Sequence, residues 1–313
     1  MAETVEAGGR EVALSNTDKV LFPGPGRDPG LTKGDLVDYY RRVAATMLPH
    51  VTGRPVSMHR FPDGIDGKRF FQKDAPDYFP DWIRMEEVGK EGGTVRHVVC
   101  DDAATLVYLA NQACITPHVW LSRVAHLERP DRLVLDLDPP EGGGRSGDDR
   151  GVDRLRCVAR RTRDLLDELD LPAFLMTTGS RGFHVVVPLE PAAGFDEVRE
   201  LAAGVARHLA RRHPDRLTVE HRKAKRGDRV FVDYLRNGYA QTAVPPYAVR
   251  ARPGAPVAAP LEWRELGRAT PRRYTVTNLL RRLAQKEDPW AGIDDSAATL
   301  DGAREALRKM AGG

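Results

Sequence analysis

Two aspartates at the end of a strand-like segment are the first candidates for chemistry in this chain. Asp136 and Asp138 lie in RLVLDLDPP (132–140), which is typical of a strand that is ended by two prolines. Because side chains alternate along a strand, both carboxylates point to the same face. Carboxylate oxygens suit Mg²⁺ or Mn²⁺, and two such ions about 3.5–4 Å apart can activate a hydroxyl nucleophile and stabilise a leaving pyrophosphate. The alternative is a plain strand end at which Asp-Pro begins a turn.

A third aspartate strengthens the prediction of a metal site. Asp233 lies in RVFVDYL (229–235), whose other residues favour burial in a sheet. An ionised carboxylate in such a run is costly unless it is paired, hydrogen-bonded or bound to a metal ion. The alternative is an aspartate at the exposed end of an edge strand.

A glycine-flanked turn and a basic run are candidates for phosphate binding. The segment TTGSRGFHVVVPL (177–189) contains the turn GSRG, whose backbone N–H groups and Arg181 guanidinium can bind a phosphate. His184, in the strand that follows, could donate a hydrogen bond to the same phosphate. The run HRKAKRGDR (221–229) holds five Lys/Arg against the single Asp228. The alternatives are an ordinary hairpin turn, a histidine of the core and a solvated basic loop.

The apolar periodicity predicts the elements that position these residues. Short strands joined by tight turns are expected over 54–74, and a glycine-rich loop over 141–151. Further strands are expected at 132–140, 174–178, 183–189, 217–220 and 229–235. Helices are expected at 33–48 with Thr32 as the N-cap, at about 101–113 with Asp101 or Asp102 at the start, at 152–170 and 195–212, and in the tail at 274–284 and 296–310. Strands and helices in this order predict an α/β or α+β fold with helices packed on a sheet.

Composition narrows the class of protein. The 313 residues are 41% hydrophobic, which is enough to bury a core, and Lys+Arg 48 against Asp+Glu 45 give a formal charge of only +3. That charge is too small to indicate a nucleic-acid binder by itself. Cys100, Cys114 and Cys157 form neither a C-x-x-C pair nor a zinc spacing, so we expect free or buried thiols in a reducing cytosol. Because we find neither a signal peptide nor an apolar run of membrane-spanning length, we expect a soluble cytoplasmic protein with no membrane contact.

The order of these motifs resembles a known family. A strand with D-x-D, a helix, a hairpin with G-x-x-G-x-H and a strand aspartate follow one another as in the archaeo-eukaryotic primase superfamily. The surrounding sequence resembles most closely the polymerase domain of bacterial DNA ligase D, which works in non-homologous end joining. The matching stretches spread over nearly the whole chain: LSNTDKVLFP (14–23), LTKGDLVDYY (31–40), RPVSMHRFPDG (54–64), FFQKDAP (70–76), LVLDLDPP (133–140), TTGSRGFHVVVPL (177–189) and VFVDYLRNGYAQTAVPPYAVRARPGAPVAAPLEW (230–263).

This resemblance implies a primase-polymerase-like α/β (α+β) fold, with mixed β-sheets flanked by helices. We expect one domain over 1–313, with an N-terminal subregion at about 1–130 for template and end-phosphate contacts and a catalytic subregion at about 131–313. The chain lacks a K-x-D-G ligase nucleophile, so we expect ligation to come from another polypeptide or from regions outside this sequence.

The resemblance also implies a role for individual residues at the catalytic centre. Asp136, Asp138 and Asp233 would be the catalytic residues and would hold two ions, Mn²⁺ or Mg²⁺. The nucleoside triphosphate site would be lined by His118, Thr178, Arg181, His184, Arg226, Gln241 and Arg250. Arg181 stands where relatives commonly carry lysine, which exchanges a point charge for a planar fork.

DNA contacts are implied at two places in the N-terminal subregion. Phe70 and Phe71 resemble an aromatic pair that stacks on bases near the templating position, and an ordinary buried pair of strand residues is the alternative. Lys19 and Lys33 match lysines that bind the 5′-phosphate at a gap or break, and FPGPGRDPG (22–30) between them can fold back so that both meet one phosphate.

The function implied is a metal-dependent, template-directed DNA/RNA polymerase, a nucleotidyltransferase that fills and extends DNA ends in non-homologous end joining and prefers ribonucleotides and Mn²⁺. Its partners would be nucleoside triphosphates, DNA with gaps, overhangs or 5′-phosphorylated ends, Ku and a separate DNA ligase, with association with the nucleoid during repair. One alternative is a primase that starts chains de novo. A second is a non-catalytic DNA-end-binding scaffold that recruits ligase and Ku, against which the presence of all three aspartates argues.

Overall fold

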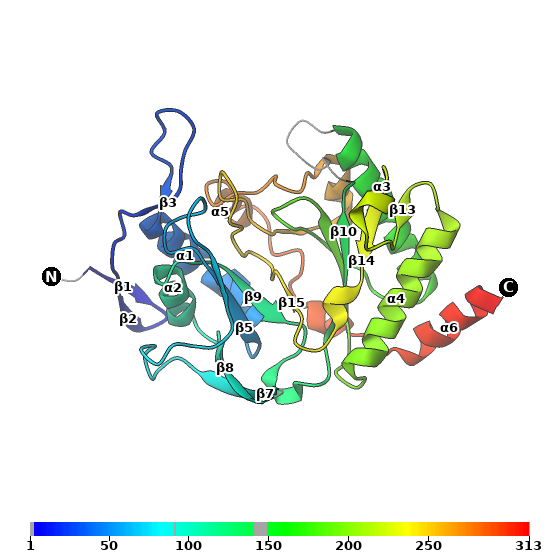
Figure 1. Ribbon diagram of the computed structural model, residues 1–313, viewed down its shortest axis with the longest axis horizontal. Helices are drawn as coiled ribbons and strands as arrows, with labels where there is room; N and C mark the ends of the chain where they lie inside the picture. The colour runs from blue at the N-terminus through cyan, green and yellow to red at the C-terminus, as the bar shows by residue number, and fades with distance from the viewer. Residues whose placement is uncertain (1–2, 91, 141–148, 313) are drawn as a thin grey trace. The chain divides into compact units, whose positions relative to one another are not determined.

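The chain forms two folded units, each of which consists of three separate segments of the sequence. The computed structural model describes residues 3–90, 92–140 and 149–312 (Figure 1). The glycine-rich loop expected at 141–151 lies mostly outside these residues. Unit 1 consists of Met1–Ala125, Val244–Ala258 and Tyr274–Glu287, and unit 2 consists of His126–Ala243, Ala259–Arg273 and Asp288–Gly313.

Unit 1 contains an antiparallel sheet with the order β9-β5-β8-β7, in which β6 also pairs with β5. Two small hairpins, β1-β2 and β3-β4, precede this sheet in the chain. The elements of the unit are β1 (Thr4–Ala7), β2 (Arg10–Ala13), β3 (Val20–Phe22), β4 (Leu31–Thr32), α1 (Lys33–Val51), β5 (Pro55–Arg60), β6 (Phe70–Gln72), β7 (Met85–Lys90), β8 (Gly93–Val99), α2 (Ala103–Asn111), β9 (Cys114–Trp120) and α5 (Leu279–Leu283).

The two helices expected in the N-terminal part are confirmed, together with their caps. Thr32 accepts a hydrogen bond from the backbone of Asp35, and the Asp35 carboxylate accepts one from the Thr32 backbone, which completes a capping box. The Asp102 side chain caps α2 by accepting from Thr105 N. The apolar face of α1 is buried, and Tyr40 donates its hydroxyl to the carbonyl of Ile115 in β9. Cap and periodicity together therefore determine where these helices begin and what they cover.

The prediction of a helix at 274–284 is wrong for the first half of that range. Only Leu279–Leu283 is helical, because the residues before it pair with the returning segment 244–258 instead. The Val257 amide donates to the Tyr274 carbonyl at 2.8 Å, and the Val276 amide donates to the Ala255 carbonyl at 3.1 Å. These non-local backbone hydrogen bonds outweigh a weak local preference for helix.

Unit 2 contains a sheet with the order β13-β14-β10-β12-β11-β16. All neighbouring strands are antiparallel except β13 and β14. The elements of the unit are β10 (Arg132–Asp138), α3 (Asp149–Glu168), β11 (Phe174–Thr177), β12 (Phe183–Pro188), α4 (Phe195–Arg212), β13 (Leu217–Thr218), β14 (Val230–Asp233), β15 (Thr242–Ala243), β16 (Pro260–Leu261) and α6 (Asp301–Gly312).

The two long helices α3 and α4 cover one face of this sheet (Figure 1). Leu133, Leu135 and Leu137 of β10 are completely buried. Because side chains alternate along the strand, the face that carries these leucines packs on the helices, and Asp136 lies on the opposite face. The tail helix α6 begins later than the predicted 296, because Ala298 donates its amide to the Pro188 carbonyl and forms a bridge with Leu189.

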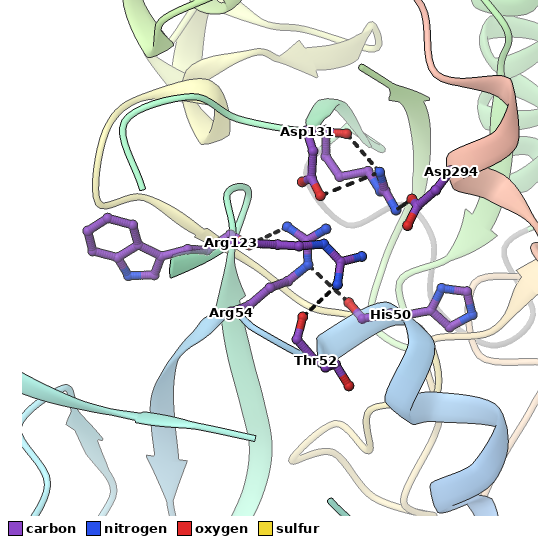
Figure 2. A network of polar contacts seen from close by, with 8 residues as sticks. His50, Thr52, Arg54, Arg123, Asp131 and Asp294 are labelled. Atoms are coloured by element: carbon purple, nitrogen blue, oxygen red, sulfur yellow. Dashed lines mark hydrogen bonds and ion pairs between the residues drawn. The ribbon is translucent and has the colours of Figure 1, made fainter. Parts of the chain in front are cut away.

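Buried arginines donate to backbone carbonyls in each unit (Figure 2). In unit 1, Arg54 is 2% exposed and donates to the carbonyls of His50 and Trp120, both at 3.2 Å. In unit 2, Arg132 donates to the Asp131 carbonyl at 2.7 Å and forms an ion pair with Asp294. Guanidinium groups satisfy carbonyls that would otherwise be buried without a partner.

The fold class predicted from the sequence is confirmed: both units combine β-sheets with flanking helices. Cys100 and Cys114 are buried free thiols, and Cys157 is a partly exposed one. Within the described ranges, every helix is too short or too polar to cross a bilayer.

Candidate active site

The three predicted catalytic aspartates are brought together by strand register in unit 2. In β10, Asp136 stands directly opposite His184 of β12 on one side and Asp233 of β14 on the other. Residues that are directly opposite in antiparallel strands present their side chains on the same face. Asp138 follows Asp136 by two residues and therefore shares this face as well. The arrangement is a row of ionisable groups across three adjacent strands, on the face opposite the helices.

The carboxylates of this row lie close enough to affect one another's ionisation. Burial, together with the neighbouring carboxylates of Asp136 and Asp233, raises the pKa of Asp138 to about 6, against the opposing effect of Arg181. Asp136 is only 7% exposed. Desolvated like charges at this spacing favour either a proton or a cation, so the donor set fits divalent metal ions bound through hard oxygen ligands.

The carboxylates do not form a closed metal cage by themselves. Within the described ranges, no three His, Cys, Asp or Glu side chains are grouped closely enough to hold an ion. Asp233 directs one carboxylate oxygen to the backbone amide of Leu235 at 2.8 Å. The three carboxylates therefore converge through strand register and a shared face of the sheet.

A histidine and an arginine lie on either side of the Asp136 carboxylate. His184 Nε2 lies 3.5 Å from one oxygen, and Arg236 Nε lies 3.7 Å from the other. These distances are electrostatic contacts rather than hydrogen bonds. Arg236, with a half-exposed side chain, is a functional candidate that sequence reasoning missed. The only feature of the sequence that could have indicated Arg236 is its position three residues after Asp233. In the structure it lies in the 3₁₀ turn Leu235–Asn237 that follows β14.

The GSRG turn is held tightly against the end of β10. The Thr178 hydroxyl donates to the Gly182 carbonyl at 3.0 Å and accepts from the amides of Ser180 and Gly182, so Thr178 builds the turn. A side chain at Gly182 would meet the Leu137 carbonyl at 1.9 Å, which explains the glycine. Arg181 donates to the carbonyls that follow β10, and its buried Nε has no hydrogen-bond partner among the described residues. That unsatisfied donor is available to an anion near Asp138.

The basic run 221–229 lies between β13 and β14, and its Arg226 reaches the active face. The guanidinium of Arg226 stacks 3.6 Å from the centroid of Phe231 and donates to the carbonyls of Glu220 and His221. Phe231 precedes Asp233 by two residues, so the arginine lies on the same face as the aspartates. Gln241 is exposed and lies between β14 and β15. Its backbone N–H donates a hydrogen bond to the Gly238 carbonyl.

The remaining predicted nucleotide-binding residues, His118 and Arg250, belong to unit 1. His118 of β9 has its ring centroid 5.4 Å from Phe71 and 6.0 Å from His59. Burial, together with the positive charges of Arg250, Arg69 and Arg252, lowers the pKa of His59 to about 4. Two histidines, an aromatic ring and an arginine thus gather at the β5-β6-β9 part of the sheet.

The aromatic pair of β6 is exposed, which excludes the alternative of a buried strand pair. Phe70 and Phe71 are 51% and 50% exposed. Large apolar side chains rarely stay exposed in neighbouring pairs unless they contact something. The pair is available for stacking on bases.

Lys19 and Lys33 lie together at the base of the β3-β4 hairpin. The Lys33 amide donates to the Lys19 carbonyl at 2.8 Å, so the segment between them does fold back. Burial lowers the pKa of Lys33, and the nearby Lys19 ammonium lowers it further. Lys33 Nζ contacts the Ser15 hydroxyl at 3.3 Å, and Lys19 Nζ contacts Asp63 at 2.9 Å. The two ammonium groups are therefore close enough to repel each other.

Comparison with known proteins agrees with this geometry. Residues 32–290 match the family model described as "LigD, primase-polymerase domain". The chain is 35% identical over 300 residues to the multifunctional non-homologous end joining DNA repair protein LigD of Mycobacterium tuberculosis, which covers 93% of this chain and 38% of that protein. It is 30% identical over 284 residues to the bifunctional LigD of Bacillus subtilis, covering 90% of this chain and 44% of the relative.

A solved structure is similar over the same region. The polymerase domain of Mycobacterium tuberculosis ligase D in complex with DNA superposes with a TM-score of 0.82 at 35% identity, covering 92% of this chain and 99% of that one. The chain therefore spans well under half the length of these curated relatives, and almost all of the isolated polymerase domain.

Proposed function

Because the chain belongs to the LigD primase-polymerase domain family, we propose that it fills and extends DNA ends by metal-dependent, template-directed nucleotide addition. Membership makes it a nucleotidyltransferase of the polymerase class. The relatives named above act in non-homologous end joining, and we assign this chain to the same repair process, with Ku and a separate DNA ligase as partners.

One observation carries this proposal above the others. The register of β12, β10 and β14 places His184, Asp136 and Asp233 in one row, on the side of the sheet that the helices leave uncovered. A scaffold that only binds DNA has no use for carboxylates that face one another on adjacent strands, because they repel phosphate. A nucleotidyltransferase needs such a row to hold metal ions.

The proposed ligands of two Mg²⁺ or Mn²⁺ ions are Asp136, Asp138 and Asp233. When bound, such ions neutralise charge on the triphosphate and promote ionisation of the primer hydroxyl. In the reaction, the primer 3′-oxygen forms a bond to the α-phosphorus, and the bond from that phosphorus to pyrophosphate breaks.

The cationic residues around the carboxylates would bind the triphosphate. Arg181 offers a buried Nε donor beside Asp138, and His184 lies next to Asp136. For Arg226 to bind a phosphate, its guanidinium must exchange two carbonyl contacts for charge-assisted hydrogen bonds, which are the stronger kind. The other proposed triphosphate-site residues are His118, Thr178, Gln241 and Arg250.

DNA binding is assigned to unit 1. The exposed rings of Phe70 and Phe71 would stack on bases near the templating position. Lys19 and Lys33 would bind a 5′-phosphate at a gap or a break. A pair of lysines gains more from a terminal phosphate than from a diester, since the terminal group carries more charge.

Primer extension on a gapped duplex with a 5′-phosphate tests the proposal. The experiment compares Mn²⁺ with Mg²⁺, and ribonucleotides with deoxyribonucleotides, and we expect Mn²⁺ and ribonucleotides to give the faster extension. Failure of the wild-type chain to extend the primer with either ion would refute the polymerase assignment. Dinucleotide formation on single-stranded template without primer would assign the chain to primases that start chains de novo.

A further inference from the structure

A groove in unit 2 lies outside the proposed catalytic site. It has a volume of about 210 Å³ and lies between α4 and the C-terminal helix α6, which pack side by side (Figure 1). Four of its lining residues are arginines, namely Arg207 and Arg211 of α4 and Arg304 and Arg308 of α6, against a single glutamate, Glu200. The groove is therefore strongly cationic, although the chain as a whole is nearly neutral.

Three of these arginines, Arg207, Arg211 and Arg308, have no acidic partner among the described residues, and Arg211 contacts His208. Arg304 is neutralised by Glu197 at 2.7 Å and lies 3.7 Å from Glu200. Arg207 and Arg308 are exposed, and no carboxylate of the described residues lies within ion-pair distance of either one. Two adjacent guanidinium groups without counter-charges, on separate helices, raise the local potential and attract anions.

The groove also has an apolar floor. Leu201 of α4 is buried, and Leu307 of α6 lies against Gly204, where an added Cβ would approach the leucine to 2.7 Å. The missing side chain at Gly204 lets the two helices approach closely, which makes the groove narrow. The lining thus combines leucine methyl groups with guanidinium groups.

The combination of leucine and arginine side chains favours some kinds of anionic partner over others. A phosphodiester backbone offers oxygen atoms to its contacts and gains little from leucine. An amphipathic acidic segment offers carboxylates to the arginines and apolar side chains to the leucines. In addition, α4 covers the face of the sheet opposite Asp136, so the groove does not lie on the face that carries the proposed catalytic row.

We propose that the groove between α4 and α6 is a docking site for an acidic, amphipathic segment of a partner protein. Carboxylates of that segment pair with Arg207 and Arg308, and its apolar side chains pack on Leu201 and Leu307. This site is separate from the proposed catalytic row, so its occupation does not require the polymerase reaction.

Fluorescence anisotropy on the full chain tests this docking site. The probe is a labelled helical peptide of glutamate and leucine at amphipathic spacing, and a peptide with every glutamate replaced by glutamine serves as its control. The groove variant is Arg207→Gln/Arg308→Gln. Its matched control is Arg160→Gln/Arg199→Gln, which removes the same charge from two exposed arginines of unit 2 outside the groove lining.

We expect the groove variant to bind the acidic peptide about tenfold more weakly, since two exposed charge pairs are lost. The matched control should change by less than about twofold, because it removes the same net charge elsewhere. Glu200→Gln should bind the peptide more tightly than wild type, because a repelling carboxylate is removed. Thermal unfolding and primer extension should be unchanged in every variant.

Three results would overturn the docking site. One is an equal loss of peptide affinity in both double variants, because the loss would then depend on net charge alone and not on the groove. Another is equal binding of the glutamine peptide. A third is loss of affinity for a labelled single-stranded oligonucleotide, without loss of peptide affinity, in the groove variant, which would assign the groove to nucleic acid.

Discussion

Replacing Lys19 and Lys33 together by alanine should abolish a preference for gapped DNA with a 5′-phosphate and leave the affinity for the unphosphorylated gap nearly unchanged. The two residues meet at the base of the β3-β4 hairpin, where the Lys33 amide donates to the Lys19 carbonyl. Lys33 is only 5% exposed, and its pKa is lowered by burial and by Lys19. A bound phosphate relieves both penalties.

The size of this preference follows from the charges. Two unit charges 4 Å apart interact by about 4 kcal/mol at an effective dielectric constant of about 20. A terminal phosphate carries about −1.5 to −2 charges, against −1 for a diester. Lys19 has a side chain that is 41% exposed and shares its charge with Asp63, so its contribution is strongly screened. After this discount, the extra charge adds about 1–2 kcal/mol, or a preference of roughly fivefold to thirtyfold.

The assay is equilibrium binding of labelled gapped duplexes that differ only in the 5′-phosphate. Lys90→Ala/Lys286→Ala removes two exposed lysines of the same unit and serves as the matched control. Lys33→Gln keeps a polar group near Ser15 and shows whether any loss in the double variant comes from the fold. Thermal unfolding of each variant is measured alongside.

Survival of the phosphate preference in the Lys19→Ala/Lys33→Ala variant would refute this reasoning. In that case the phosphate pocket lies elsewhere, and the basic run 221–229 is the next candidate. Equal weakening of both DNA forms would assign the two lysines to general contacts with the backbone.

Other parts of the structure give four further predictions. Asp233→Ala, like removal of either aspartate of β10, should lower nucleotide addition to below a few per cent while leaving DNA affinity and the unfolding temperature nearly unchanged; appreciable residual activity would remove that aspartate from the catalytic set. Arg226→Ala and Arg250→Ala should raise the KM for nucleotide, since each charge-assisted hydrogen bond contributes about 1.5–3 kcal/mol; a loss of DNA affinity alone would place them on the DNA path instead. Arg236→Gln removes a positive charge 3.7 Å from Asp136, so titration calorimetry with Mn²⁺ alone should show binding about two- to fivefold tighter, and unchanged affinity would contradict this. The pKa of His59 is about 4 in the fold, below its usual value, so its neutral form favours folding above about pH 6.5 and this contribution is lost as pH falls towards 4; urea unfolding of His59→Asn should therefore depend less on pH than wild type over that window, and parallel curves would refute the assignment.

The local sequence pattern was sufficient to predict features that depend on a single helix or strand. Alternation along β10 predicts that Asp136 and Asp138 share a face, and the structure has that face directed away from α3 and α4. Apolar spacing and Thr32 predict the start of α1, and the capping box shows why the helix begins there. These outcomes depend on neighbours within about one turn or one strand, which a sequence contains directly.

The sequence pattern gave a wrong prediction where a segment forms backbone hydrogen bonds with a distant part of the chain. The helix predicted at 274–284 forms only over Leu279–Leu283, because Tyr274 and Val276 pair with the segment 244–258. That segment and Tyr274–Glu287 both belong to unit 1. Hydrogen bonds between residues far apart along the chain leave no periodic signal, so this pairing could not be predicted.

The sequence by itself determined the family, the fold class and which aspartates share a strand face, because residue types, spacing and motif order are properties of the chain. Only the tertiary structure decided that Asp233 stands opposite Asp136 and that Arg236 lies beside that carboxylate. It also decided that four arginines of α4 and α6 line one groove. The physical reason is that strand register and helix packing bring together charges that no local rule relates, and their interaction depends on distance and burial rather than on position in the sequence.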